Sequence, residues 1–140
     1  DGGLRLCHGS CTFGWRNAVE VFNNIADFLE RNTGEVVIVM LQVGKYKESG
    51  SPIMVEDIYE LMLESIGFVS MMYEIPNGEI ISDWPKMAHF VESNKRILVF
   101  QHDGISCHFG DCANVILNAW DHFVDTPFSF KNFNALKHYP

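Results

Sequence analysis

Two polar side chains stand directly after apolar runs in this sequence, at the ends of predicted strands. His8 follows residues 4–7, and Gln42 follows the wholly apolar residues 36–41. In parallel α/β proteins the reacting groups lie just past the carboxyl ends of the strands. An imidazole is a general acid or base near neutral pH, and a carboxamide orients a phosphate by hydrogen bonds. The two residues are therefore candidates for a site at the carboxyl edge of the predicted sheet.

Each of these two residues also has a purely structural explanation. Leu4, Leu6 and His8 share one face of a strand, so His8 points into the mouth of a barrel if that face is the interior. On spacing alone, a hydrogen-bonded structural histidine explains the pattern slightly better. Gln42 shares a face with Met40, so it also points into the mouth. A hydrogen bond from its side chain to a buried loop carbonyl explains the presence of Gln42 equally well.

Other polar residues near strand ends are candidates for the same site. Asp103 comes after residues 97–100 and is able to ligate a metal or hold a histidine, although His-Asp-Gly is also an ordinary turn sequence. Lys45 is able to neutralise phosphate charge, whereas a solvated loop lysine is the simpler account. His102 also follows residues 97–100, but its parity predicts the opposite face. The candidate site thus comprises catalytic His8 and substrate-binding Gln42, Lys45 and Asp103.

The elements that position these residues follow from the hydrophobic pattern. Residues 4–7, 36–41 and 97–100 are predicted strands, and residues 36–41 are typical of a strand buried on both faces of a parallel sheet. We expect these strands to be parallel neighbours in chain order, joined by right-handed crossovers. Apolar spacing predicts helices over 19–31, 55–66 and 114–122, and Asp83 as N-cap predicts a further helix with Pro85 in its first turn. A fourth strand is predicted over 124–130.

Alternating strands and helices of this kind predict a parallel α/β fold. A closed (β/α)₈ barrel of TIM type needs roughly 250 residues, so four strands within 140 residues correspond to about half of one. We expect residues 1–140 to form one partial barrel domain, a fragment of a larger protein. A small doubly wound domain is the alternative, although no glycine-rich phosphate loop follows the first strand.

Composition and charge restrict the class of partner. Hydrophobic residues make up 47% of the chain and charged residues 20%, which is typical of a globular domain. The formal net charge of −8 argues against nucleic-acid binding, which needs a cationic face. A phosphate substrate stays open because local charge decides its binding. No apolar run is long enough to predict a membrane-spanning helix.

The four cysteines form two short pairs, Cys7 with Cys11 and Cys107 with Cys112. Adjacent histidines suggest a zinc site, but zinc sites use tighter Cys-x-x-Cys spacing. Cysteines in loops at strand ends suit disulfides of an oxidising compartment better. We predict a local disulfide between Cys107 and Cys112. The pairing of Cys7 and Cys11 stays open, since Cys11 is equally able to pair upstream.

Several segments, taken in order, resemble a known family. The run Leu-Arg-Leu-Cys-His-Gly-Ser-Cys, a helix, and then Asn-Thr-Gly-Glu-Val-Val-Ile-Val-Met-Leu resemble the X region of phosphatidylinositol-specific phospholipase C-like phosphodiesterases. The secreted, cysteine-containing branch of fungi and other lower eukaryotes is the most similar. Residues 83–85, 95–100 and 125–130 match the next helix, strand and following strand of the same family. The resemblance covers nearly the whole chain.

The resemblance implies a TIM-type barrel that cleaves phosphodiesters, such as inositol phospholipids or glycolipid anchors, with paired histidines. One histidine deprotonates the attacking hydroxyl, and the second, which His8 matches, protonates the leaving oxygen. A divalent metal such as calcium or magnesium, or an arginine in the bacterial branch, neutralises the phosphate. Gln42 falls where family members carry a metal-binding Glu or a Lys. The first histidine and the acidic metal ligands belong upstream of Asp1.

We therefore expect a fragment of a secreted phosphoric diester hydrolase with little activity on its own. Its substrate is expected to be a phospholipid or another phosphodiester, which is compatible with peripheral contact with a membrane. Two other classes fit the sequence. One is a catalytically silent secreted barrel used for binding, and the other is a zinc-stapled Cys/His interaction module.

Overall fold

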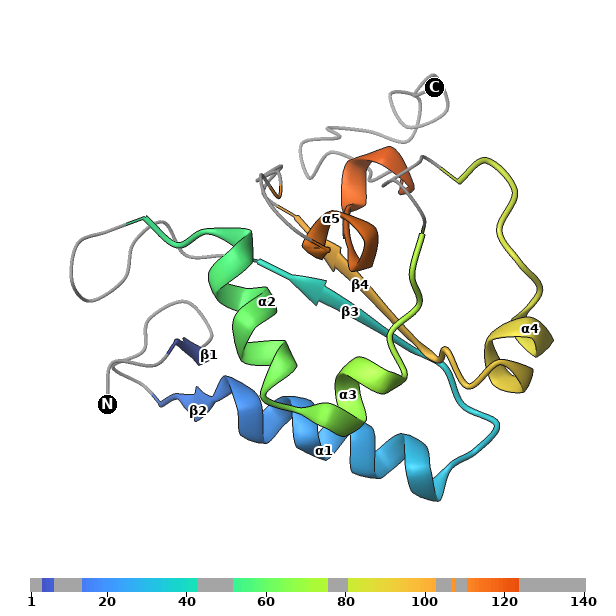
Figure 1. Ribbon diagram of the computed structural model, residues 1–140, viewed down its shortest axis with the longest axis horizontal. Coiled ribbons are helices and arrows are strands. Elements are labelled where there is room, and N and C mark those ends of the chain that lie inside the picture. The colour runs from blue at the N-terminus through green and yellow to red at the C-terminus, as the bar shows by residue number, and fades with distance from the viewer. Residues whose placement is uncertain are drawn as a thin grey trace, which may run out of the picture.

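A three-stranded parallel sheet forms the centre of the computed structural model, which describes residues 4–6, 14–42, 52–75, 81–102, 107 and 111–123. The strands are β3 (Val37–Leu41), β4 (Ile97–Gln101) and β5 (Ile116–Asn118), in that spatial order (Figure 1). Residues 36–41 and 97–100 are thus confirmed as parallel neighbours, and the parallel α/β class is confirmed with them.

The longest helix of the described residues, α1 (Ala18–Arg31), agrees with the predicted helix over 19–31. Its N-cap is Asn17, whose side-chain oxygen accepts hydrogen bonds from the backbone N–H groups of Val19 at 2.9 Å and Glu20 at 3.3 Å. A cap of this kind satisfies backbone donors that the first helical turn leaves without partners. The start of α1 is therefore fixed locally by the sequence.

The helix predicted over 55–66 is divided into α2 (Val55–Leu63) and α3 (Ile66–Ser70). The break lies at Ser65, a fully buried residue whose hydroxyl donates to Asn23 Oδ1 of α1 at 2.6 Å. Just beyond it, α3 packs closely on α1, because a Cβ at Gly67 would lie only 3.2 Å from the Cβ of Ala26. Tertiary contact with α1 therefore outweighs the continuous helical spacing.

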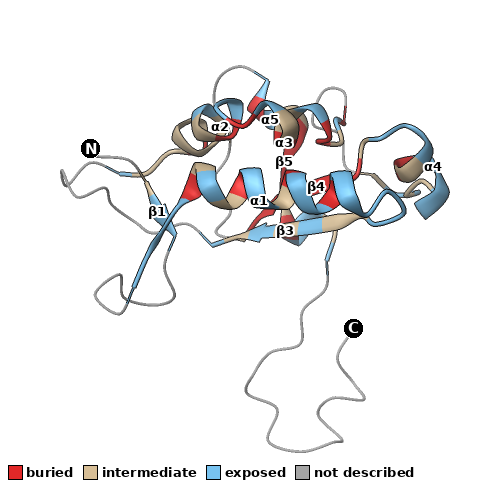
Figure 2. Cartoon of the chain, turned by 90° about the horizontal axis from the view of Figure 1, so that it is seen from below, coloured by how far each residue is buried: buried red, intermediate tan, exposed pale blue. Residues whose placement is uncertain are grey.

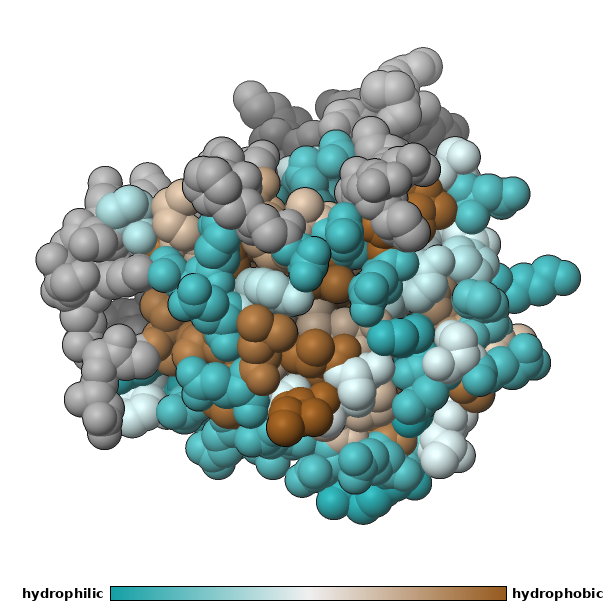
Figure 3. Space-filling model, viewed as in Figure 1, coloured by the Kyte–Doolittle hydropathy of each residue, from teal (hydrophilic) through white to brown (hydrophobic). Residues whose placement is uncertain are grey.

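Helices cover one face of the sheet, as both views show (Figures 1 and 2). The core between the layers contains buried side chains from the helices together with one face of each strand. Its members include Phe22, Leu29, Val55, Met62, Phe68, Ile97, Val99, Cys112, Val115 and Ile116. The Phe22 and Phe68 ring centroids lie 4.8 Å apart, which locks α1 to α3. On the outside of this layer, hydrophilic side chains follow α1, and a smaller apolar area lies over α2 and α3 (Figure 3).

The opposite face of the sheet is covered unevenly. Leu98, Phe100 and Leu117 are buried there, against Trp84 and against Phe90 of α4 (Met87–Glu92). On the neighbouring strand β3, by contrast, Ile38 is 58% exposed and Met40 is 48% exposed. The prediction that residues 36–41 are buried on both faces is therefore wrong, because β3 is an edge strand of the described sheet.

The predicted first strand does not join this sheet in the described residues. Arg5–Leu6 forms β1, which pairs antiparallel with β2 (Arg16–Asn17) in a separate two-stranded sheet. Strands inside a parallel sheet are almost continuously apolar. Arg5 interrupts the apolar run here, and both β1 residues are exposed. The expectation that residues 4–7 form a central parallel strand is wrong for this reason.

Two further expectations are corrected. The predicted helix over 114–122 is α5 (Cys112–Val115), then β5 and a 3₁₀ turn, Ala119–Asp121. β-Branched Ile116 favours a strand, and residues 116–118 pair in register with residues 99–101 of β4. The helix expected to begin at Asp83 starts at Met87 instead, after Lys86 as N-cap. The fourth predicted strand, 124–130, lies outside the described residues.

Candidate active site at the carboxyl ends of the strands

The parallel strands β3, β4 and β5 bring their carboxyl ends to one edge of the sheet. Gln42 directly follows β3, and His102 directly follows β4. The backbone N–H of His102 donates to the carbonyl oxygen of Leu41 at 2.8 Å, so the ladder between the two strands continues to this point. Gln42 and His102 are therefore neighbours across adjacent strands.

The register also places these two residues on the same face. Ile38 pairs with Leu98 and Met40 pairs with Phe100, and side chains that pair in register point the same way. Continuing the alternation by two residues brings Gln42 and His102 to the face opposite the α1–α3 helices. The expectation that His102 lies on the opposite face is wrong. The alternation of side chains through Leu98 and Phe100 is the signal that identifies the face on which His102 lies.

A third residue of this edge, Trp120, comes from the turn after β5. Its indole Nε1–H donates to the carbonyl oxygen of His102 at 2.6 Å, and the two ring centroids lie 4.8 Å apart with the planes at 66°. Asn118, the last residue of β5, accepts from the Trp120 backbone N–H at 3.4 Å. The indole thus braces the backbone of His102. No spacing in the sequence connects residues 102 and 120, because parallel pairing of β4 with β5 creates the contact.

The chemistry of this edge is that of neutral hydrogen-bonding groups. Gln42 is an exposed carboxamide, and His102 is a half-buried imidazole. The described residues at the edge are Gln42, Gln101, His102, Asn118 and Trp120, and none of these five carries a carboxylate. Calcium and magnesium prefer carboxylate oxygens. The described residues therefore do not fit the divalent metal that the family resemblance implies, and we derive no metal-dependent step.

Three of the candidate residues, His8, Lys45 and Asp103, lie outside the described residues. Their placement in the site stays a prediction. Gln42 is the one predicted substrate-binding residue that the structure describes, and the structure adds His102 and Trp120 beside it.

The two cysteines of the second pair, Cys107 and Cys112, form a disulfide with their Cα atoms 6.0 Å apart. The bridge joins residue 107 to the first residue of α5, and closing so short a loop contributes about 2 kcal/mol. The Glu56 carboxylate lies within 4.8 Å of both sulfur atoms. Because the sulfurs are bonded to each other, they do not act as thiolate ligands, and this pair does not support a zinc-stapled module. Cys7 and Cys11 lie outside the described residues.

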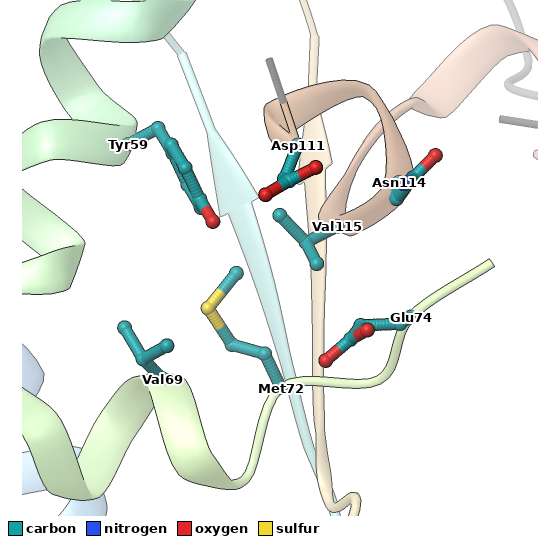
Figure 4. A pocket seen from close by; sticks show the side chains of 7 residues that line it. All are labelled: Tyr59, Val69, Met72, Glu74, Asp111, Asn114 and Val115. Carbon is teal, nitrogen blue, oxygen red and sulfur yellow. The ribbon is translucent and has the colours of Figure 1, made fainter. Parts of the chain in front are cut away.

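A separate cavity of about 240 Å³ lies on the helix-bearing side of the sheet, between α2, α3 and α5 (Figure 4). The carboxylates of Glu74 and Asp111 and the hydroxyl of Tyr59 converge over Met72 and Val115. Burial, and then the charges of Asp111 and Glu74, raise the pKa of Tyr59. Lys95 pairs with Glu74 at 3.4 Å, but Asp111 and Glu74 together still leave the lining negative, so this cavity does not suit a phosphodiester. The carboxyl edge remains the candidate active site.

Comparison with known proteins identifies the class. The model of the family described as PI-PLC X 1 matches residues 1–137. The chain therefore belongs to the phosphatidylinositol-specific phospholipase C X-region family. It is also 28% identical over 134 residues to an uncharacterized secreted protein of Arthroderma benhamiae, an alignment that covers 92% of this chain and 27% of the relative. The chain thus spans about a quarter of that protein's length, and no solved structure matches it.

Proposed function

We propose that this chain forms part of a secreted phosphoric diester hydrolase of the phospholipase C class. The observation that carries the proposal is that Gln42 and His102 follow adjacent strands at the carboxyl edge of a parallel sheet, in a chain of the PI-PLC X family. Such edges hold the reacting groups of parallel α/β enzymes. Secretion is supported by the secreted relative and by the disulfide of residues 107 and 112.

For the architecture, we propose a TIM-type barrel of which residues 1–140 contribute a part. The support is the asymmetry of the described sheet. Helices α1, α2, α3 and α5 share a core with one face. On the other face α4 and Trp84 cover β4 and β5, while Ile38 and Met40 of β3 lie bare. A doubly wound domain covers the whole of both faces with helices. A barrel instead encloses that second face, which places Gln42 and His102 at its mouth.

In the proposed reaction, the substrate's own hydroxyl attacks the phosphorus and the bond to the leaving oxygen breaks. His8 donates the proton that the leaving oxygen takes up, and a general base accepts the proton of the attacking hydroxyl. Gln42 and Lys45 bind the phosphoryl oxygens, the first by hydrogen bonds and the second by charge. Asp103 orients an imidazole. His102, which faces Gln42 across the strands, contacts the head group.

A catalytically silent binding barrel is the second candidate, and one observation favours it. Gln42 is neutral where the resemblance implies a metal-binding Glu or a Lys, and the described edge offers no formal charge for the phosphate. A barrel that keeps its hydrogen-bonding edge but loses charge stabilisation binds a phosphodiester without cleaving it.

An assay of the full-length protein separates these candidates. Incubation with phosphatidylinositol vesicles is expected to release diacylglycerol and a phosphorylated inositol, which phosphorus NMR detects. The 140-residue chain, assayed beside it, is expected to turn over at least about 100-fold more slowly, because it supplies one of the two acid–base groups. Phosphatidic acid as the product would refute the phospholipase C class. Binding of the vesicle lipid without any product would establish the silent barrel.

A further inference from the structure

The outer surface of α2 and α3 exposes large apolar side chains. Ile66, the first residue of α3, is 83% exposed, and Leu63, the last residue of α2, is 48% exposed. The space-filling view shows an apolar area over these two helices, between hydrophilic side chains (Figure 3). We call Leu63 and Ile66 the apolar patch. Such side chains are normally buried, so their exposure needs an explanation when they adjoin a further binding feature.

The apolar patch adjoins the cavity between α2, α3 and α5. Residues three or four apart in a helix lie on the same side of it. Leu63 therefore continues the side of α2 that carries Tyr59, and Ile66 lies on the side of α3 that carries Val69. Tyr59 and Val69 both line the cavity, together with the buried side chain of Met72 (Figure 4). An apolar surface thus runs from the exposed patch into the cavity.

The surroundings of the patch and the cavity are acidic. Residues 52–75, which include both helices, contain no lysine, arginine or histidine and have five acidic side chains: Glu56, Asp57, Glu60, Glu64 and Glu74. Asp111 adds a carboxylate from the other side of the cavity. A concave surface lined by charge of one sign concentrates partners of the opposite sign. This surface therefore attracts a cationic partner and repels anionic lipids, nucleic acids and a second copy of itself.

The rim of the cavity already holds one cation. The ammonium of Lys95 lies 3.4 Å from Glu74 Oε1. Asp111, by contrast, is exposed and has no ion pair within the part of the chain that the structure describes. Burial, and then the charges of Asp111 and Glu74, raise the pKa of Tyr59, and the same negative charges stabilise a cation that enters here. The carboxylate of Asp111 is therefore available to a cationic group from outside.

The cavity suits the long side chain of an arginine or lysine. At about 240 Å³ it accommodates a side chain rather than a helix or strand. Arginine and lysine pack their methylene groups on apolar surface while the charged head reaches polar groups, and the Tyr59 ring adds a cation–π partner. A free amine in the cavity leaves Leu63 and Ile66 exposed. A peptide covers them with the side chains that flank its cation, so the surface favours a protein segment.

We propose that the apolar patch and the cavity together dock a segment of a partner protein. One arginine or lysine of the segment enters the cavity beside Asp111, and its apolar neighbours cover Leu63 and Ile66. This interaction goes beyond the proposed function and does not depend on it. The surface lies on the helix-bearing face of the sheet, whereas Gln42 and His102 lie on the opposite face.

The test is an NMR titration of the ¹⁵N-labelled chain with three short, acetylated and amidated peptides. Ser-Leu-Arg-Leu-Ser is expected to shift the signals of residues 59–72 and 111–115 together, to saturate, and to leave Gln42 and His102 unchanged. Ser-Leu-Glu-Leu-Ser should bind at least about tenfold more weakly, because its charge is repelled. Ser-Ser-Arg-Ser-Ser should also bind about tenfold more weakly, because it leaves the apolar patch uncovered.

Two substitutions of exposed residues locate the contact. Asp111→Asn should weaken binding of the arginine peptide about threefold, within the range of one exposed ion pair. Ile66→Ser should weaken it about fivefold through lost apolar contact. The matched controls are Glu92→Gln and Met87→Ser, which remove an exposed carboxylate and a 62% exposed apolar side chain from α4, on the other face of the sheet. Both should bind the peptide as the unchanged chain does.

Several results would overturn the proposal. They are the absence of saturable binding of the arginine peptide, equal binding of the arginine and glutamate peptides, and equal losses in all four variants. Shifts confined to Gln42 and His102 would place the peptide at the carboxyl edge and contradict the proposed surface. If the signals of residues 59–72 shift with protein concentration alone, and Ile66→Ser abolishes this shift, the patch belongs to a second copy of the chain instead.

Discussion

Replacing His8 by alanine in the full-length protein should lower the turnover of phosphatidylinositol by on the order of 10²–10⁴-fold. The proposed general acid protonates an alkoxide-like leaving oxygen, and this proton is needed most in the transition state. We therefore expect the loss in kcat, with KM little changed, because the imidazole contributes to the reaction more than to binding of the ground state. The measurement is steady-state hydrolysis of phosphatidylinositol by the two proteins.

The leaving group provides an internal check on this role. An aryl phosphodiester releases a phenolate that needs little protonation, so His8→Ala should reduce its turnover far less than that of the lipid. His89→Ala is the control, because His89 is an exposed residue of α4 away from the carboxyl edge. Equal losses on both substrates would assign His8 a structural role instead. A full rate in His8→Ala would remove it from the site.

The second large effect is on stability. Arg96→Met should lower the free energy of unfolding by about 3 kcal/mol, since hydrogen bonds from a charged donor contribute about 1.5–3 kcal/mol each. Arg96 is 4% exposed, and its Nη1 donates to the carbonyl oxygens of Leu29 at 2.9 Å and Asn32 at 3.0 Å. Its Nε donates to Asn94 Oδ1 at 2.9 Å. The guanidinium thus joins the start of β4 to the carboxyl end of α1, where a cation also complements the helix dipole.

Urea unfolding measures this loss, and thermal unfolding should shift downward by about 10 °C for a chain of this size. Arg31→Met is the matched control, because Arg31 lies in the last turn of the same helix but is exposed. Its change should stay within about 0.5 kcal/mol. Arg96→Lys should lie between the two, since an ammonium lacks the planar fork that spans three acceptors. A stability of Arg96→Met equal to that of the control would contradict the bridging role.

The sequence predicts those elements whose pattern and tertiary surroundings agree. α1 has a wide apolar stripe and an asparagine cap, so it is found within one residue of its predicted start. β4 is buried throughout, as its apolar residues indicate, and it pairs with β3 as expected. The parallel α/β class follows from these elements alone.

Elements whose structure depends on contacts between residues far apart in the sequence are not predicted correctly from local patterns. The buried Ser65, bonded to Asn23, divides one predicted helix into two. The residues after Val115 have the apolar spacing of a helix but the composition of a strand. They form a strand because residues 116–118 pair with β4. The first segment pairs locally because β2 lies only ten residues away along the chain, and Arg5 is better placed in water than in a sheet.

The candidate site likewise contains residues that local patterns predict and residues that only long-range contacts bring together. Gln42 was predicted from its own strand, because one strand is enough to give its position and parity. Parity along the sequence predicts that His102 lies on the other face, and only the register between β3 and β4 brings it beside Gln42. Trp120 reaches His102 through a third strand, a relation that no local pattern carries.

The most direct test of the central claim is to locate a bound phosphate on the protein by NMR. The ¹⁵N-labelled chain is titrated with myo-inositol 1-phosphate, and the resonances of Gln42, His102 and the Trp120 indole are followed. The account predicts that these signals shift together and saturate, that Gln42→Ala weakens the binding severalfold, and that myo-inositol without phosphate has little effect. Saturable shifts centred on Tyr59 and Asp111, with the carboxyl edge unchanged, would contradict it.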